Sequence, residues 1–189
     1  MRLRSGFLFL AAALVLPAQT RPVTVVIETG LGIIEAEIDT LHAPVTAANF
    51  LKYVDEGRYD SGRFHRTVKP DNQPDNAVKI EVIQGGRAPG SAGYPAISLE
   101  RTSVTGILHL DGVISMARSG PDTATSDFFI CVGDQPSLDF AGKRNPDGQG
   151  FAAFGRVVKG MDVVRKIQMA PAQGQSLTPP VQILKIARK

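Results

Sequence analysis

The residues of this chain that could do chemistry lie in a few short segments and consist of an arginine, an amide and an aromatic ring. Arg66 closes the segment Phe64-His65-Arg66, Gln84 precedes a pair of glycines, and Phe129 lies in an apolar run. No acid–base pair and no nucleophile accompanies them. Such a set suits a reaction in which no covalent bond forms or breaks. Rotation about a peptide bond that precedes proline is one such reaction.

Arg66 has the chemistry that this rotation needs. An amide resists rotation with a barrier of ~18–20 kcal/mol, whereas the two isomers of an X-Pro bond differ by only about 0.5–1 kcal/mol. Catalysis must therefore stabilise the twisted amide, whose nitrogen is pyramidal and basic. A guanidinium suits this task because it stays charged and presents several donors in a rigid fork. By sequence context alone, a surface or salt-bridged arginine is still the better interpretation of Arg66, and an ordinary strand-end amide remains open for Gln84.

Short apolar segments separated by glycine and proline must position these side chains. Apolar residues at three- and four-residue spacing predict a helix from Pro44 to Gly57, and a second short helix runs from near Gly160 to before Pro171. Many short strands with two helices favour a closed, mostly antiparallel barrel, since closure removes exposed strand edges. We expect a hairpin at residues 23–38, strands at 80–83, 112–116, 128–132, 151–158 and 181–186, loops at 69–77 and 138–150, and a linker at 173–180.

The first twenty residues are typical of a secretory signal peptide. Arg2 and Arg4 precede an apolar run at residues 6–16, which small and polar residues follow. The run is shorter than the about 20 residues that a membrane-spanning helix needs. A buried helix of the mature protein is the less favoured alternative. We expect cleavage after Ala18 or Thr20.

Net charge gives no support to two classes of partner, and the single cysteine gives none to a reactive thiol. The formal net charge is +3, and removal of Arg2 and Arg4 would leave +1, so net charge supports neither a nucleic-acid nor an anionic-membrane partner. The single cysteine, Cys131, lies in an apolar run and is predicted to be a small buried side chain rather than a reactive thiol.

The three histidines do not indicate a metal site. His42, His65 and His109 are scattered, with no cluster at ligand spacing. His65 neighbours Arg66 on a predicted strand, so alternation predicts that it faces the barrel core. We expect neither a metal nor another cofactor.

Five motifs in order resemble those of the cyclophilins, and in particular of the exported bacterial cyclophilin-type peptidyl-prolyl isomerases. They are Phe64-His65-Arg66, Gln84-Gly85-Gly86, and the segments 112–118 (GVISMAR), 126–130 (SDFFI) and 154–157 (FGRV). The resemblance covers residues 23 to about 187. It implies a mostly β fold, a closed eight-stranded antiparallel barrel capped by two α-helices, with substrate bound in a groove on its outer surface.

The resemblance also implies roles for eight residues. Arg66 matches the family's catalytic arginine, and Gln84 matches the glutamine that holds it. The remaining six match positions that bind substrate around the proline: Phe129 as the aromatic floor, Ala117 as a wall, and Leu138, Phe151, Val82 and Asp127 around them.

The chain departs from the family pattern at several positions. Asp127 replaces a common glutamine, and its carboxylate could pair with Arg66 and compete with the substrate, or could accept from a substrate N–H. Glu81 and Arg118 are expected to form a solvated surface pair or to bias binding toward charged substrates. Ser137 stands where some members carry the tryptophan linked to cyclosporin binding, so tight cyclosporin binding is not expected.

These observations predict an exported isomerase, with a signal peptide at residues 1–20 and one domain at residues 21–189. It would act in the periplasm or outside the cell on proline-containing polypeptides, as a monomer without a stable membrane anchor. Two alternatives remain open. One is a catalytically weak cyclophilin-fold module that holds proline-containing segments as a chaperone or adaptor, and the other is an exported barrel that carries an apolar ligand inside.

Overall fold

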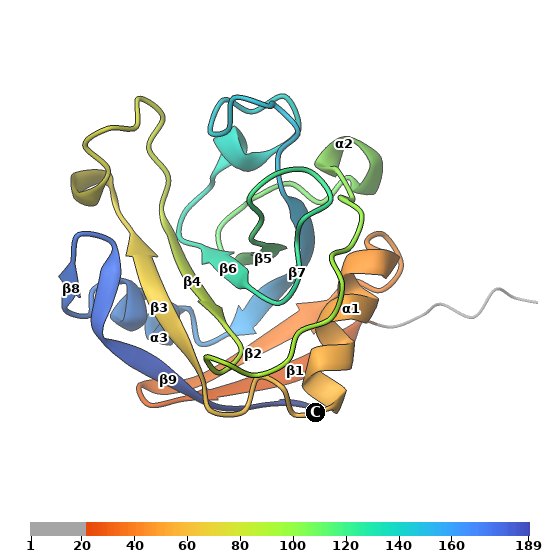
Figure 1. Ribbon diagram of the computed structural model, residues 1–189, viewed down its shortest axis with the longest axis vertical. Coiled ribbons are helices and arrows are strands. Elements are labelled where there is room, and N and C mark those ends of the chain that lie inside the picture. The colour runs from red at the N-terminus through yellow and green to blue at the C-terminus, as the bar shows by residue number, and fades with distance from the viewer. Residues whose placement is uncertain (1–21) are drawn as a thin grey trace, which may run out of the picture.

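A computed structural model describes residues 22–189 of the protein, so the predicted signal peptide lies outside the described residues. Eight antiparallel strands form a closed barrel in the order β1-β2-β7-β5-β6-β4-β3-β9, and pairing of β9 with β1 closes it (Figure 1). The two-residue strand β8 (Ala172–Gln173) is added to β9. The barrel strands are β1 (Val23–Thr29), β2 (Gly32–Ile38), β3 (Gly62–Val68), β4 (Val82–Gly86), β5 (Val113–Met116), β6 (Phe128–Cys131), β7 (Ala152–Lys159) and β9 (Ser176–Arg188). The predicted closed barrel is confirmed.

Two helices flank the barrel on opposite sides in Figure 1, as predicted. α1 (Pro44–Asp55) begins with proline, whose fixed φ suits the first helical turn. α3 (Met161–Gln168) follows Gly160, whose φ of 91° is a conformation that favours glycine. A four-residue helix, α2 (Thr102–Thr105), was not predicted. No helix among residues 22–189 combines the length and apolar content needed to cross a membrane.

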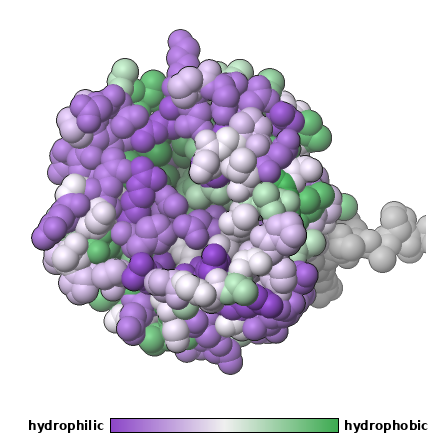
Figure 2. Space-filling model, viewed as in Figure 1, coloured by the Kyte–Doolittle hydropathy of each residue, from purple (hydrophilic) through white to green (hydrophobic). Residues whose placement is uncertain are grey.

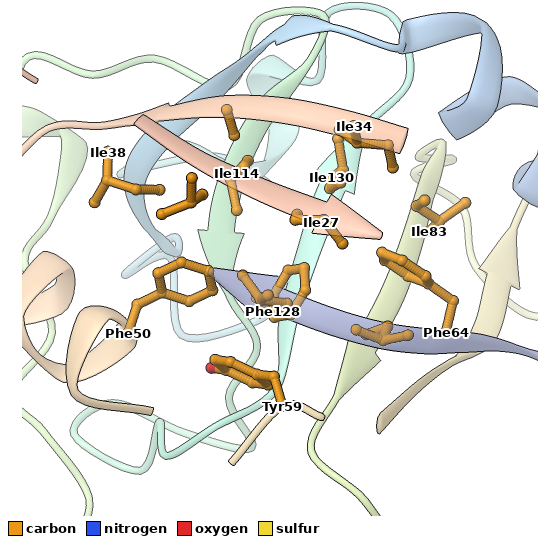
Figure 3. Close-up of a cluster of buried hydrophobic side chains, with 14 of the residues drawn as sticks. Ile27, Ile34, Ile38, Phe50, Tyr59, Phe64, Ile83, Ile114, Phe128 and Ile130 are labelled. Carbon is orange, nitrogen blue, oxygen red and sulfur yellow. The ribbon is translucent and has the colours of Figure 1, made fainter. Parts of the chain in front are cut away.

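The interior of the barrel is filled by branched and aromatic side chains. Fully buried isoleucines and aromatic rings converge from strands on all sides, and Phe50 of α1 joins them (Figure 3). Phe128 packs edge-on against the rings of Phe50, Tyr59 and Phe64 at centroid distances of 5.5–5.8 Å. Protein side chains therefore occupy the space that an internal apolar ligand would need, which argues against the carrier alternative.

A bulge in β3 decides which way its side chains point. Phe64 pairs with Gly85 and Arg66 with Gln84, so His65 is an extra residue with no partner on β4. Without the bulge, Phe64 and Arg66 would share one face of the strand. With it, Phe64 lies in the core and Arg66 on the outer surface. The prediction that His65 faces the core is wrong: this side chain is half-exposed, 3.6 Å from the carboxylate of Asp127.

The predicted linker at residues 173–180 is also wrong. β8 and the start of β9 lie there, and β9 continues through two prolines to Arg188. The ladder with β3 is irregular over this stretch, where Phe64 pairs with Val181 and Arg66 with Ser176. Proline lacks a backbone N–H, and this irregular ladder accommodates it.

Candidate active site

A cleft of about 200 Å³ lies on the outside of the barrel, over β3, β4 and β6. On the face drawn in Figure 2, apolar surface is visible in a hollow surrounded by hydrophilic residues. Seven of the eight predicted site residues line this cleft, and Asp127 lines an adjoining recess that shares Gln84, Ala117 and Arg118 with it. The cleft is lined by Arg66, Ile80, Val82, Gln84, Ala117, Arg118, Phe129, Leu138, Arg144, Asn145 and Phe151.

The floor of the cleft is a second apolar cluster, separate from the barrel core. Because side chains alternate along β6, Phe128 points into the core and Phe129 points into the cleft. The rings of Phe129 and Phe151 meet edge to face, with centroids 5.3 Å apart. Cys131 is buried in the same cluster, where burial raises the pKa of its thiol, as expected for a packing residue. The cluster comprises Val68, Ile80, Val82, Phe129, Cys131 and Leu138, with Ala117 and Phe151 packed against it.

The guanidinium of Arg66 stands at the edge of this floor and is held by two neutral amides. Its Nη1 donates to Gln84 Oε1 at 3.0 Å, and its Nε donates to Gln175 Oε1 at 2.9 Å. Its Nη2 donates to the same oxygen of Gln175. The side chain is half-buried, and this burial lowers the pKa of Arg66. Neither partner carries a charge, so both orient the cation without neutralising it.

Gln175 is a site residue that the sequence did not predict. It lies in the turn between β8 and β9, beside Ser176, which pairs with Arg66 in the sheet. Its own Nε2 donates to the carbonyl oxygen of Asn72 at 3.0 Å, which fixes the orientation of the amide. The only sequence signal was a glutamine after a glycine, and such a signal is too weak to identify a role.

Asp127 contacts the positioning glutamine rather than Arg66. Its Oδ2 accepts from Gln84 Nε2 at 3.5 Å. The sheet order explains this, because β4, which carries Gln84, lies between β3 and β6. The pairing of Asp127 with Arg66, one of the two alternatives from the sequence, is therefore not observed. The carboxylate favours the amide orientation that directs Oε1 of Gln84 toward the guanidinium. Gly86 leaves room for this carboxylate, since an added Cβ there would overlap it.

Arg118 also lines the cleft and binds the loop that ends at Phe151. Its Nη1 and Nη2 donate to Asp147 Oδ2 and Oδ1 at 2.8 and 3.0 Å, and its Nε donates to the carbonyl oxygen of Gly150 at 2.8 Å. The guanidinium carbon lies 4.9 Å from the centroid of the Phe151 ring. Hydrogen bonding to Arg118 is the main cause that lowers the pKa of Asp147 to about 2. The expected surface pair of Glu81 and Arg118 is wrong, because Glu81 instead accepts from Gln168 Nε2 at 2.9 Å.

A buried histidine supports the floor from behind. His109 stacks on Phe129 at a centroid distance of 6.0 Å and an interplanar angle of 15°. Its Nδ1 lies 2.7 Å from Asp139 Oδ1, and its Nε2 lies 3.0 Å from Ser115 Oγ. This order resembles a nucleophilic triad, but Ser115 is fully buried and cannot reach a substrate. The three residues therefore fix the ring of Phe129.

Comparison with known proteins identifies the family. A family model described as cyclophilin type peptidyl-prolyl cis-trans isomerase/CLD matches residues 24–188. The chain belongs to this family. Individual relatives agree. This cyclophilin is 39% identical over 152 residues to peptidyl-prolyl cis-trans isomerase-like 1 of Neurospora crassa, and the match covers 78% of this chain and 82% of that protein. It is 36% identical over 159 residues to peptidyl-prolyl cis-trans isomerase A of Dickeya dadantii, covering 82% of this chain and 76% of that protein.

A solved structure supports the fold of this cyclophilin. The crystal structure of a cyclophilin type peptidyl-prolyl cis-trans isomerase of Cryptosporidium parvum matches with a TM-score of 0.71 at 22% identity, covering 89% of this chain and 98% of that chain. The family membership and the curated relatives make the protein a peptidyl-prolyl cis-trans isomerase. Among residues 22–189, no group of three or more His, Cys, Asp or Glu side chains is arranged to hold a metal ion.

Proposed function

We propose that this cyclophilin catalyses rotation of X-Pro bonds through Arg66, with the proline ring seated on Phe129. The apolar cluster offers the ring a dry surface, and burial of its methylene groups contributes about 0.8 kcal/mol for each. The guanidinium lies at the edge of this surface. A substrate held there presents its prolyl nitrogen and carbonyl to the N–H groups of Arg66.

The catalytic gain in this proposal comes from a difference between two states of the substrate. In the planar amide, the nitrogen lone pair is delocalised and is a poor hydrogen-bond acceptor. In the twisted amide, the nitrogen becomes pyramidal and basic, so a fixed cationic donor stabilises it more than the planar form. No proton is removed and no bond is broken. Gln84 and Gln175 keep the donor oriented before the substrate arrives, which lowers the reorganisation that the rotation requires.

The observation that carries the proposal is a half-buried guanidinium whose hydrogen-bond partners among residues 22–189 are neutral oxygens, beside an aromatic floor that lines the cleft. Exchange NMR on an Ala-Pro peptide tests it with Arg66→Ala and Arg66→Lys. Loss of one preorganised donor typically costs about 10²–10³-fold in rate, so we expect this loss for Arg66→Ala. Arg66→Lys keeps the charge but loses the fork, and we expect partial activity.

The control is Arg156→Ala, which removes an exposed arginine of β7 that does not line the cleft. Its activity should equal that of the unchanged protein. If Arg66→Ala turned over the peptide at the normal rate, the role of Arg66 would be refuted.

We further propose that the enzyme is exported and assists the folding of proline-containing proteins beyond the inner membrane, as a monomer without a membrane anchor. The basic start and the short apolar run at residues 6–16 support export. Expression of the full chain in a Gram-negative host, followed by fractionation and intact mass, tests this. A mature periplasmic chain beginning after Ala18 or Thr20 is expected, and an uncleaved cytoplasmic chain would refute export. Light scattering of the mature chain tests the monomer.

A further inference from the structure

Arg144 is a cation of the cleft that the proposed mechanism does not use. It lines the cleft together with Asn145, and both come from the long loop between Leu138 and Phe151. The backbone N–H of Arg144 donates to the carbonyl oxygen of Ser137 at 3.1 Å, so the loop holds the residue in place. The side chain is half-buried.

The partners of Arg144 orient its charge without cancelling it. Its Nη1 donates to Gln73 Oε1 at 2.8 Å and to the carbonyl oxygen of Val78 at 2.6 Å. Both acceptors are neutral. Its Nε and Nη2 make no hydrogen bond to any other residue of the described range 22–189, so these donors remain for a ligand. Burial and the nearby charge of Arg66 lower the pKa of Arg144, consistent with a cation that lacks a carboxylate partner.

The charges around the cleft do not balance. Three arginines line it, and of these only Arg118 has a carboxylate partner among residues 22–189, namely Asp147. No acidic residue of the described range lines the cleft itself. The adjoining recess contains the carboxylate of Asp127 beside Arg118, whose charge Asp147 already balances. The groove is therefore positive at the end of Arg144 and carries a carboxylate at the end of Asp127.

We propose that Arg144 determines specificity and selects prolyl substrates that carry an acidic side chain on one side of the proline. The inference rests on the proposed placement of the proline between Phe129 and Arg66. An extended peptide advances about 3.3–3.6 Å per residue. In a cleft of about 200 Å³, the acidic side chain that contacts Arg144 therefore belongs to a residue one or two positions from the proline. Asp127 repels an acidic side chain at the other end, so the preference is one-sided.

Matched peptides test the proposal. Two pairs differ only in Glu against Gln, placed directly after the proline in one pair and two residues before it in the other. Exchange NMR gives kcat/KM for each peptide, and the readout is the Glu/Gln ratio within a pair. A partly exposed ion pair is worth about 0.2–1 kcal/mol, so a ratio of about 1.4 to 5 is expected in one pair only. The ratio should fall as salt is raised.

Two variants complete the experiment. Arg144→Gln should bring the ratio to one, whereas Arg156→Gln, an equal change of charge on exposed β7, should leave it unchanged. Melting temperatures check that both variants fold. Equal kcat/KM for Glu and Gln peptides in both pairs, or a ratio that survives Arg144→Gln, would overturn the inference. Failure of the proposed function is distinct, because it shows as normal turnover of a neutral peptide by Arg66→Ala.

Discussion

Replacement of Gln175 by methionine tests whether neutral amides position Arg66 for the proposed catalysis. Methionine keeps the length and approximate volume of glutamine and removes only the polar atoms. Gln175 Oε1 accepts from both Nε and Nη2 of Arg66, while Gln84 holds Nη1. The variant therefore leaves the guanidinium with one of its two amide partners and free to turn about its last torsions.

The size of the effect follows from these contacts. A hydrogen bond to a charged group contributes about 1.5–3 kcal/mol, but water can replace part of it because Arg66 is half-buried. We therefore expect the barrier to rise by about 1.4 kcal/mol, which is a tenfold loss of rate. The apolar floor is unchanged, so the loss should appear in kcat with KM nearly constant.

Exchange NMR on an Ala-Pro peptide measures this loss, with thermal melts to report folding. Gln173→Met is the matched control, because Gln173 is exposed and its side chain makes no hydrogen bond within the described range. Gln175→Glu adds a second test. It keeps an acceptor for Arg66 but neutralises the cation, so activity should fall although the arginine stays in place. A Gln175→Met enzyme within twofold of normal kcat would refute the reasoning.

Three further changes probe the wall, the packing beside the site and the core. Asp147→Asn should lower the melting temperature fully above pH 4. The effect should shrink as pH falls and vanish below pH 2, because the pKa of Asp147 is lowered from 3.8 to about 2; a constant difference from pH 2 to 7 would contradict this. Gly86→Ala should cost about 1–3 kcal/mol of unfolding free energy by overlap with the Asp127 carboxylate, and the loss should be smaller when Asp127→Ala is added. Ile130→Ala, at a fully buried core position of β6, should cost about 2–5 kcal/mol in urea unfolding, and a cost below 1 kcal/mol would show that the core collapses around the gap.

Local sequence patterns were sufficient to predict the helices of this protein and the alternation of side chains along β6. Alternation along β6 separates Phe128 from Phe129, and helical spacing places α1 and α3 close to their predicted bounds. These features depend on neighbours in sequence, so they can be read from the chain. The motif residues also predicted the cleft, since seven of the eight line it.

The sequence by itself therefore determined a closed barrel and most of the predicted residues that line its cleft. Tertiary structure alone decided that His65 is partly exposed rather than in the core, because the β3 bulge cancels the alternation on which its prediction depended. It also decided the partners of the arginines, since Gln175 lies 109 residues from Arg66 and Asp147 lies 29 residues from Arg118. Hydrogen bonds across such separations depend on strand register and loop path, which are set when the whole barrel closes and which no short segment specifies.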